Sequence, residues 1–340
     1  MITANERYSR QIKLPEIGMH GQEKLRQAKI LIVGMGGLGC PAAQYLSAAG
    51  VGTLGLMDAD AVDVTNLHRQ ILYGESDIGQ PKVEAASDAL KRLNPETVFH
   101  TYPEGLGLFN ASKIISVYDL IIDGTDNFQT KYLINDACIL AYKPWVYASI
   151  YKYEGQLSVF NHQEGPTYRC LFPKVPQSDI SCEATGVIGV LPGILGTYQA
   201  TEALKIILGI GNVLSGKLKI IHTLTMQEQL ISFKRNEHEV MKVLNRNLQV
   251  EAVGCELLDE KKTYLDVREL HEQPQPQNAN VLRIPLSELA DRHAEVSEKV
   301  PVYVYCQSGK RSKKAIEILS ESYGYKNLIN VEGGIQTLLI

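Results

Sequence analysis

The most regular feature of the chain is an alternation of short apolar runs with amphipathic stretches between residues 29 and 123. Short β-branched runs predict buried strands, and apolar positions three and four residues apart predict helices. The pattern predicts strands at 29–33, 53–57, 97–101 and 118–122 and helices at 39–49, 81–93 and 110–116, after a helical arm at 5–28. This order is typical of an α/β fold whose mostly parallel sheet carries helices on both faces.

The pattern changes after the fourth of these strands. Residues 145–150 and 155–160 predict antiparallel strands, and a buried helix at about 192–208 follows a proline-containing loop. Strands near 217–223 and 228–234 complete a mixed sheet. We therefore expect a first domain at residues 1–240.

A second, smaller α/β pattern occupies the rest of the chain. Residues 241–262 are charged and weak in periodicity, which is typical of a linker. Beyond them we predict strands at 263–268, 281–284, 302–305 and 327–331 and a helix at 311–320. These elements predict a small α/β domain at residues 263–340.

Composition narrows the class of protein. A length of 340 residues is enough for two domains, and a net charge of −4 without a basic block argues against nucleic-acid binding. The longest apolar window, 186–210, is interrupted by polar residues, and the first residues lack a signal-peptide pattern, so we expect no membrane span and no secretion. The six cysteines form no CxxC pair, which favours a reducing cytoplasm.

The first predicted strand ends in a glycine-rich turn that opens a helix. Its glycines are Gly34, Gly36, Gly37 and Gly39. Backbone N–H groups and the positive end of the helix dipole make such a turn a phosphate cradle. Asp58 ends the next strand, 24 residues after Gly34, where an acidic residue accepts hydrogen bonds from a ribose.

Polar residues follow the strands that neighbour this turn. They are Asp58–Asp60, Asn66–Gln70 with Lys82, and Asp123–Asn127. Lys82, Arg69 and Arg10 of the arm can neutralise phosphate oxygens, and Asp126 is an oxygen ligand suited to Mg²⁺. This inventory fits attack of a carboxylate on a nucleotide α-phosphate, a reaction that needs mainly positioning and charge neutralisation.

The glycine turn alone leaves one alternative open. No Gly-Lys-Ser/Thr follows the glycines, so the turn is not a Walker motif. The base–acid pair of a hydride-transfer enzyme is also missing. A dinucleotide-binding domain of an NAD-dependent oxidoreductase stays as the alternative, because a glycine-rich turn is weak evidence by itself.

Cys306 follows the third predicted strand of the second domain and precedes a helix. The loop between them contains Gln307, Ser308, Gly309, Lys310 and Arg311. Loop N–H groups, the helix N-terminus and the two cations favour a thiolate or the terminal sulfur of a persulfide. Four residues separate Cys306 from Arg311, one fewer than in a tyrosine-phosphatase loop, so sulfur transfer is favoured over phosphate binding.

Six motifs within residues 5–235 resemble the ubiquitin-activating-like adenylyltransferases of the ThiF, MoeB and HesA type. They are Arg7–Gln11, Gly34–Gly39, Asp58–Asp60, Asn66–Gln70, Gly79–Lys82 and Asp123–Asn127. The resemblance implies a Rossmann-like domain with a mixed sheet, a homodimer, and the use of ATP and Mg²⁺. It further implies adenylylation of the C-terminal glycine of a ubiquitin-like sulfur-carrier protein that ends in Gly-Gly.

The same resemblance implies roles for individual residues. Arg10 would be an arginine finger that reaches the ATP of the partner subunit, and Asp126 would hold Mg²⁺. The other nucleotide-binding residues would be the four glycines, Asp58 at the ribose, Asn66, Arg69 and Lys82 at the phosphates, and Gln70.

Two cysteines of the first domain need separate interpretation. Many family members hold a structural zinc on two CxxC pairs, but the first pair here reads Thr167–Cys170, with threonine first, and no second pair follows. Because tetrahedral zinc needs four ligands, we predict no zinc and a packed Cys170. Cys182 lies in the loop where some members carry a catalytic cysteine that forms a thioester or acyl disulfide with the carrier; an ordinary loop thiol is the alternative.

The second domain resembles a single rhodanese, or sulfurtransferase, domain. The residues that carry this resemblance are Leu265–Arg268, Ile284–Leu286, Cys306–Ser312 and Asn330–Gly334. We therefore expect a Cys306 persulfide, loaded by a cysteine desulfurase or thiosulfate, to convert the carrier adenylate into a thiocarboxylate. The product would serve molybdopterin, thiamin or related biosynthesis. A non-catalytic carrier-binding scaffold and a ubiquitin-type conjugating enzyme are further alternatives.

Overall fold

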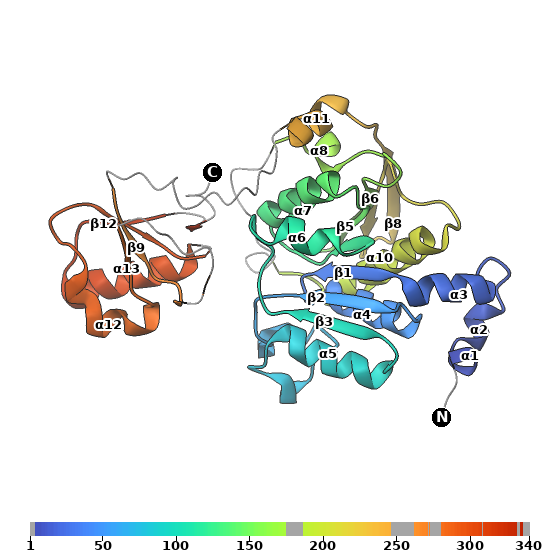
Figure 1. The fold of residues 1–340 in the computed structure, drawn as a ribbon, viewed down its shortest axis with the longest axis horizontal. Coiled ribbons are helices and arrows are strands. Elements are labelled where there is room, and N and C mark those ends of the chain that lie inside the picture. The colour runs from blue at the N-terminus through green and yellow to red at the C-terminus, as the bar shows by residue number, and fades with distance from the viewer. Residues whose placement is uncertain are drawn as a thin grey trace. The chain divides into compact units, whose positions relative to one another are not determined.

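The chain divides into two compact units, Met1–Leu248 and Gln249–Ile340. A computed structural model describes residues 4–174, 186–245, 262–270, 272, 280–307, 309–331 and 334–335 (Figure 1). Cys182, Ser308 and Gly333 lie outside the described residues.

The first unit is built on a sheet whose eight described strands run in the order β3-β2-β1-β4-β5-β6-β7-β8. Their bounds are β1 Lys29–Val33, β2 Thr53–Met57, β3 Val98–Tyr102, β4 Leu120–Asp123, β5 Trp145–Tyr151, β6 Glu154–Phe160, β7 Lys217–His222 and β8 Gln227–Ser232. Strands β3, β2, β1, β4 and β5 are parallel, and β6, β7 and β8 continue the sheet antiparallel. The predicted mixed sheet is therefore confirmed.

Helices cover both faces of this sheet (Figure 1). Their bounds are α1 Ala4–Arg7, α2 Ser9–Ile12, α3 Gly18–Gln27, α4 Gly39–Ala48, α5 Lys82–Leu93, α6 Ala111–Ser116, α7 Phe128–Leu140, α8 Tyr168–Leu171, α10 Val190–Leu208 and α11 Glu237–Asn245. Helices α3, α4, α5 and α10 share one apolar core with the sheet, and α6, α7 and α8 share the other.

The central strand β1 shows why two cores form. Ile30 and Ile32 belong to the core with α4 and α10, whereas Leu31 and Val33 belong to the core with α6 and α7. Successive side chains of a strand point to opposite faces, so a strand that is apolar throughout needs a cover on both. The edge strand β8 differs, because every one of its residues is exposed.

The predicted helical arm is broken into α1, α2 and α3. Pro15 follows α2 closely, and Gly18 has a φ of +55° at the start of α3. Proline lacks the N–H that a helix interior needs, and glycine tolerates the left-handed backbone, so both residues favour a change of direction. The arm packs along α3 and reaches the amino ends of β2 and β3 through Tyr8 and Gln11.

The longest helix absent from the sequence prediction is α7. Helix α7 is buried on several sides, and Ala137, Cys138 and Ile139 are three consecutive buried residues. A helix of this kind has no clean polar face, so its 3.6-residue period is weak. Helix α11 lies across the predicted domain boundary at residue 240, with its N-terminal end next to α8, and residues 246–261 lie outside the described residues.

The second unit is a small α/β unit with a parallel sheet in the order β10-β9-β11-β12 among the described residues. Its strands are β9 Thr263–Asp266, β10 Val281–Arg283, β11 Val302–Tyr305 and β12 Leu328–Asn330, and its helices are α12 Leu289–Arg292 and α13 Lys310–Tyr323. The predicted strands are confirmed, β11 with its predicted bounds and the other three with slightly shorter ones, and the short α12 was not predicted.

Candidate functional site

The glycine turn lies where the chain order of the sheet reverses. From β1 the chain continues to β2 and β3 on one side, and it returns to β4 on the other side. Val33 is in register with both Met57 and Asp123, so the residues that follow β1, β2 and β4 meet at one edge. Ligands of open α/β sheets bind at this reversal point, outside the carboxyl ends of the strands.

The turn after β1 is packed against the turn after β4. Gly34 has a φ of +94°, and a Cβ on it would lie 2.7 Å from the Gly124 backbone. The Gly124 N–H donates to the Val33 carbonyl at 2.7 Å. The two backbones therefore hold each other in place, and a side chain at Gly34 would separate them.

The four predicted glycines differ in how closely other atoms pack against them. A Cβ on Gly37 would lie 2.9 Å from Pro192 of α10, and a Cβ on Gly39 would meet the Gly34 carbonyl. Gly36 alone of the four is open, with the Gln70 amide nitrogen 3.6 Å away as the nearest atom. Three glycines thus permit close packing, whereas a Cβ at Gly36 would make only an ordinary contact with Gln70.

Asp58 clamps the glycine turn. Its carboxylate accepts hydrogen bonds from the Met35 N–H at 2.8 Å and the Asp60 N–H at 2.9 Å. Burial raises the pKa of Asp58, and the nearby ammonium of Lys82 opposes that rise. The carboxylate keeps lone pairs for a ribose, and its contact with Met35 is a second role that the sequence did not indicate.

Lys82 begins α5 and lies between two carboxylates. Its Nζ is 3.0 Å from Asp60 and 3.9 Å from Asp58, and only 8% of its side chain is exposed. Because the ammonium is buried and paired, its position is well defined at the edge of the sheet. The structure thus brings Lys82 and Asp58 together, as the sequence predicted.

The segment Asn66–Gln70 forms a compact loop beside the glycine turn. The Asn66 carbonyl accepts from the N–H groups of Arg69 and Gln70 at 3.0 and 2.9 Å. The Arg69 guanidinium donates to the Thr65 carbonyl at 3.0 Å. Gln70 is buried, and its Oε1 lacks a hydrogen-bond partner among the described residues.

Tyr73 was missed by the sequence reasoning. Its hydroxyl donates to the Met35 carbonyl at 2.8 Å, and the Cys40 thiol lies 3.4 Å from the same oxygen. Met35 is thus held through its N–H by Asp58 and through its carbonyl by Tyr73. Burial raises the pKa of Cys40 to about 12, so this thiol stays neutral and is no nucleophile.

The turn Asp123–Asn127 presents one free carboxylate. Asn127 caps α7 by accepting from the Thr130 N–H at 2.8 Å, and Asp123 is fully buried. Asp126, between them, is exposed, and its side chain has no hydrogen bond or ion pair with any described residue. Hard divalent cations choose such oxygen donors, so Asp126 fits the predicted Mg²⁺ role.

Arg10 is not near the glycine turn of its own chain. Its neighbours in sequence are fixed at the amino ends of the strands, where Asn94 donates to the Tyr8 hydroxyl at 2.8 Å and Gln11 donates to the Ala49 carbonyl at 3.0 Å. The five residues of strand β1 span about 16 Å, and this length separates the amino end of the sheet from Gly34.

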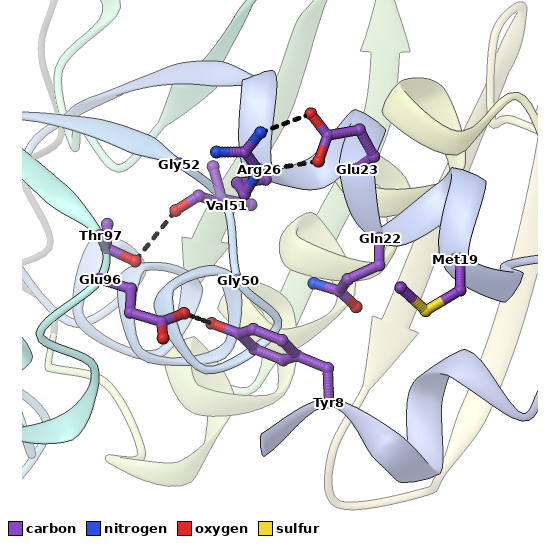
Figure 2. A pocket seen from close by; sticks show the side chains of 10 residues that line it. All are labelled: Tyr8, Met19, Gln22, Glu23, Arg26, Gly50, Val51, Gly52, Glu96 and Thr97. Atoms are coloured by element: carbon purple, nitrogen blue, oxygen red, sulfur yellow. Dashed lines mark hydrogen bonds and ion pairs between the residues drawn. The ribbon is translucent and has the colours of Figure 1, made fainter. Parts of the chain in front are cut away.

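Figure 2 shows a pocket at this same amino end, lined in part by Tyr8, Gln22, Gly50 and Glu96. Its volume is about 520 Å³. The pocket contains none of the predicted site residues, and it lies at the opposite end of the strands from Asp58.

Cys306 lies in a cradle of its own in the second unit. The thiol is fully buried, accepts from the Gly309 N–H at 3.1 Å and lies 3.7 Å from the Ser312 hydroxyl. Helix α13 begins at Lys310, and Gly309 supplies the positive φ of +88° that turns the loop into it. The predicted arrangement of a sulfur at a helix N-terminus is therefore present.

Both described arginines of this cradle are paired with carboxylates. Arg268 bonds to Asp266 at 2.7 Å with both side chains fully buried, and its guanidinium lies 3.5 Å from the Gln307 side-chain oxygen. Arg311 makes two hydrogen bonds to Glu272, at 2.6 and 2.8 Å. The sequence predicted that Arg311 adds positive charge beside the sulfur, and it did not indicate Glu272.

Cys170 is hydrogen-bonded at the junction of α8 and α11. Its sulfur accepts from the N–H groups of Thr167 at 3.3 Å and Asn236 at 3.2 Å. Within the described ranges, no three His, Cys, Asp or Glu side chains gather as a metal site. In the same ranges no helix is long and apolar enough to cross a membrane.

Comparison with known proteins agrees with this geometry. The ThiF family model matches residues 8–242, and the rhodanese-like domain model matches residues 256–338. A sulfur carrier protein adenylyltransferase of Thermus thermophilus is 47% identical over 238 residues, covering 68% of this chain and 88% of the relative. The adenylyltransferase and sulfurtransferase MOCS3 of Xenopus laevis is 36% identical over 383 residues, covering 97% of this chain and 85% of the relative.

Solved structures support the same fold. E. coli MccB with MccA-N7isoASN has a TM-score of 0.61 at 21% identity, covering 69% of this chain and 73% of that chain. E. coli MccB with ATP has a TM-score of 0.58 at 23% identity, covering 68% and 73%. The glycine turn at the reversal point and the Cys306 cradle, together with these matches, show that the chain belongs to the ThiF family and carries a C-terminal rhodanese-like domain.

Proposed function

We propose that the protein uses ATP and Mg²⁺ to adenylylate the C-terminal glycine of a ubiquitin-like sulfur-carrier protein, and then replaces AMP with sulfur from a Cys306 persulfide. The observation that carries this proposal is the presence in one chain of an open glycine turn beside Lys82 and Asp126 and a buried sulfur cradle. The names of the relatives, adenylyltransferase and sulfurtransferase, join the same two activities. They do not favour the NAD-dependent alternative.

In the first step a carboxylate oxygen of the carrier attacks the α-phosphorus of ATP, and pyrophosphate leaves. The N–H groups near Gly36 and the ammonium of Lys82 face the developing negative charge, and Arg69 can turn from the Thr65 carbonyl to a phosphate. The backbone N–H groups and Lys82 are fixed donors, and donors that need no reorganisation stabilise a transition state most. The backbone contacts of Gly34 and the clamps on Met35 support that rigidity.

Asp126 is the residue we assign to Mg²⁺. Its carboxylate is exposed and unpaired among the described residues, and it follows the turn that packs on Gly34. A bound Mg²⁺ neutralises phosphate charge. Asp58 stays with the ribose, because its carboxylate is held at the end of β2.

We propose a homodimer in which Arg10 acts on the ATP of the partner subunit. The support is geometric: the arm that carries Arg10 is fixed at the amino ends of the strands, and the glycine turn lies at their carboxyl ends. A guanidinium cannot span that separation within one chain, so a phosphate contact by Arg10 needs a second copy.

In the second step the terminal sulfur of the Cys306 persulfide attacks the carbonyl carbon of the acyl-adenylate. The carbon–oxygen bond to AMP breaks, and an acyl disulfide with Cys306 forms. Attack of the Cys182 thiolate on the Cys306 sulfur then releases the thiocarboxylate and leaves a Cys182–Cys306 disulfide, which a dithiol reductant must reduce. The Gly309 N–H supports the sulfur of Cys306 when it carries negative charge.

Three further assignments complete the proposal. Cys170 is a packed thiol, and the protein holds no structural zinc, because Thr167 stands where a ligand would be needed and its N–H bonds to the Cys170 sulfur. The sulfur donor is a cysteine desulfurase or thiosulfate. The widely spaced cysteines support a cytoplasmic location.

The test is to incubate the protein with ATP, Mg²⁺, a sulfur donor and a candidate carrier that ends in Gly-Gly. We expect carrier-dependent ATP–pyrophosphate exchange and a gain of one sulfur in exchange for one oxygen at the carrier C-terminus, measured by intact mass. Exchange that proceeds equally well without carrier would contradict the proposal. A thermal shift with NAD but not with ATP would restore the oxidoreductase alternative.

A further inference from the structure

The first unit contains a fully buried ion pair that the mechanism above does not use. Lys131 of α7 and Asp123 at the end of β4 are 2% and 0% exposed, and Nζ lies 2.7 Å from the Asp123 Oδ2. Burying two charges is costly, and apolar residues of similar size often serve stability equally well. A buried pair is better explained by what it holds in place.

Every proton of the Lys131 ammonium has an acceptor. Besides Asp123, Nζ donates to the Thr125 carbonyl at 2.9 Å and to the Ala148 carbonyl of β5 at 3.0 Å. An ammonium has three donors, so none is left for a ligand. Lys131 therefore joins the end of β4, the turn after it and β5, and it does not itself reach the nucleotide.

The remaining groups of Asp123 are also engaged. Its Oδ1 accepts from the N–H of Thr125 at 2.9 Å and from its hydroxyl at 2.6 Å. Its carbonyl accepts from Gln199 of α10 at 2.7 Å. The turn is thus held from α7 and from α10 at once.

Asp126 is the next residue after this fixed segment, and Asn127 after it is fixed as the cap of α7. Within this turn, the Asp126 side chain is the one that makes no hydrogen bond or ion pair with a described residue. The Gly124 N–H ties the same turn to β1 beside Gly34. The position of the Asp126 carboxylate relative to the glycine turn therefore depends on contacts that centre on Lys131.

We propose that Lys131, paired with Asp123, is a positioning residue that sets the Asp126 carboxylate for its metal ion. The inference rests on the proposed function, since it assumes an Mg²⁺-dependent nucleotide at the glycine turn. Residues that orient a metal ligand without touching the metal often change metal affinity or activity 10- to 100-fold when replaced.

The test is to compare wild type with Lys131→Met, Asp126→Ala and the double variant in full-length protein. The assay is carrier-dependent ATP–pyrophosphate exchange as a function of free Mg²⁺. We expect Lys131→Met to raise the Mg²⁺ concentration for half-maximal exchange about tenfold. We expect the double variant to be no slower than Asp126→Ala alone, because Lys131 acts through Asp126.

Two controls keep the result interpretable. Lys113→Met removes an exposed lysine from α6 and should leave the Mg²⁺ dependence unchanged. Lys131→Arg keeps the charge and should recover most of the loss. If Lys131→Met does not fold, Thr125→Val removes a single hydroxyl contact to Asp123 and should still raise the Mg²⁺ requirement, by a smaller factor.

Two outcomes would overturn the inference. One is a folded Lys131→Met or Thr125→Val protein whose Mg²⁺ dependence equals that of wild type. The other is a double variant in which the two losses multiply, as they would if Lys131 had only a general structural effect. Failure of wild type itself to catalyse exchange with any carrier would instead contradict the proposed function.

Discussion

The two sites share a strand–turn–helix arrangement, but they differ in how many of their charged side chains are paired. At the glycine turn, Lys82 is paired with Asp60, but Arg69 and Asp126 have no ion-pair partner among the described residues. At the Cys306 loop, both described arginines are paired, Arg268 with Asp266 and Arg311 with Glu272.

Under the proposed function, the difference follows from the charge of what each site would hold. A nucleotide triphosphate would bring several negative charges, so its site would need a cation without a carboxylate partner, such as Arg69, and a place for a metal ion. A thiolate or persulfide brings one, and N–H dipoles at a helix start can stabilise it. The paired arginines next to Cys306 then help to hold the loop in its conformation.

We expect the largest effect when the Cys306 sulfur is removed, because this change should affect one site and not the other. Cys306→Ala should abolish thiocarboxylate formation and leave carrier-dependent ATP–pyrophosphate exchange within twofold of wild type. The alanine lacks the atom that attacks the adenylate, and the nucleotide site is elsewhere in the chain. Intact mass of the carrier and an exchange assay measure both quantities. Thiocarboxylate formed by the variant would mean that another thiol carries the sulfur.

The reciprocal change is made in the nucleotide site. Asp126→Ala should lower the exchange rate by about 10²- to 10³-fold, the usual loss for one electrostatic stabiliser. Persulfide loading of Cys306 from thiosulfate should be unchanged. Loss of persulfide loading in this variant would show that the sites are not independent.

A third change tests whether the buried pair of the second unit is structural. Arg268→Met removes the nearest cation from the buried Asp266 and leaves it the Tyr305 hydroxyl and the more distant Arg283, so we expect a loss at or below the usual cost of about 3–5 kcal/mol for breaking a buried pair. Amide hydrogen exchange should then speed up in β9 and β11 and stay unchanged in β1 and β4. Equal loss of protection in both sets of strands would contradict the separation of the units.

A fourth change addresses metal. Excess chelator should leave the melting temperature of the first unit unchanged, because the N–H groups of Thr167 and Asn236 already contact the Cys170 sulfur and we predict no zinc there. Cys170→Ala should destabilise the α8–α11 contact by about 1 kcal/mol, the usual net value of a hydrogen bond. A melting temperature that falls with chelator and recovers with zinc would overturn the prediction of no zinc.

The smallest expected effect concerns Glu272. Replacing it by glutamine frees the charge of Arg311 and should lower the KM for thiosulfate about threefold, in line with about 0.2–1 kcal/mol for a partly exposed ion pair. Glu295→Gln, which frees Arg292 on the surface, is the matched control.

The pH dependence of wild type has a defined sign at this position. Burial raises the pKa of Glu272 and is the largest single influence. The hydrogen bonds from Arg311 and from the Glu269 N–H, together with the charges of Arg311 and Arg268, lower the pKa more, so the net pKa lies below its ordinary value. The pair is therefore intact above the ordinary carboxylate range and is lost only as the pH falls through the lowered pKa. The thiosulfate KM should not change through this pair between about pH 5 and pH 8; a fall of KM as the pH drops from 8 to 5 would contradict this.

Much of the fold and part of the site could be predicted from local sequence. Strand β1 and strand β2 have the predicted bounds, and Gly34, Asp58 and Cys306 stand directly after strands as expected. A repeat of two or 3.6 residues is a local property, so it can be recognised without knowing the partners of a segment. Helix α7 was not predicted because it is buried on several sides and its 3.6-residue hydrophobic period is weak.

The partners of the site residues could not be predicted in the same way. Gln199 donates to the carbonyl of Asp123 from 76 residues away, and Glu272 binds Arg311 from 39 residues away. Neither contact can be recognised from the local pattern of hydrophobic and polar residues. The sequence did not single out Lys131 either, because helix α7 was not predicted and the acceptors of this lysine come from three segments.

The sequence alone therefore determined which residue types follow each strand, and with them the two kinds of chemistry. Only the tertiary structure decided which of these residues are free and which are paired. It assigned Gly34, Gly37 and Gly39 to packing and left Gly36 open, and it placed Arg10 at the far end of the strands. The physical reason is that hydrophobic periodicity is encoded along the chain, whereas neutralisation and close backbone contact depend on segments that meet only after folding.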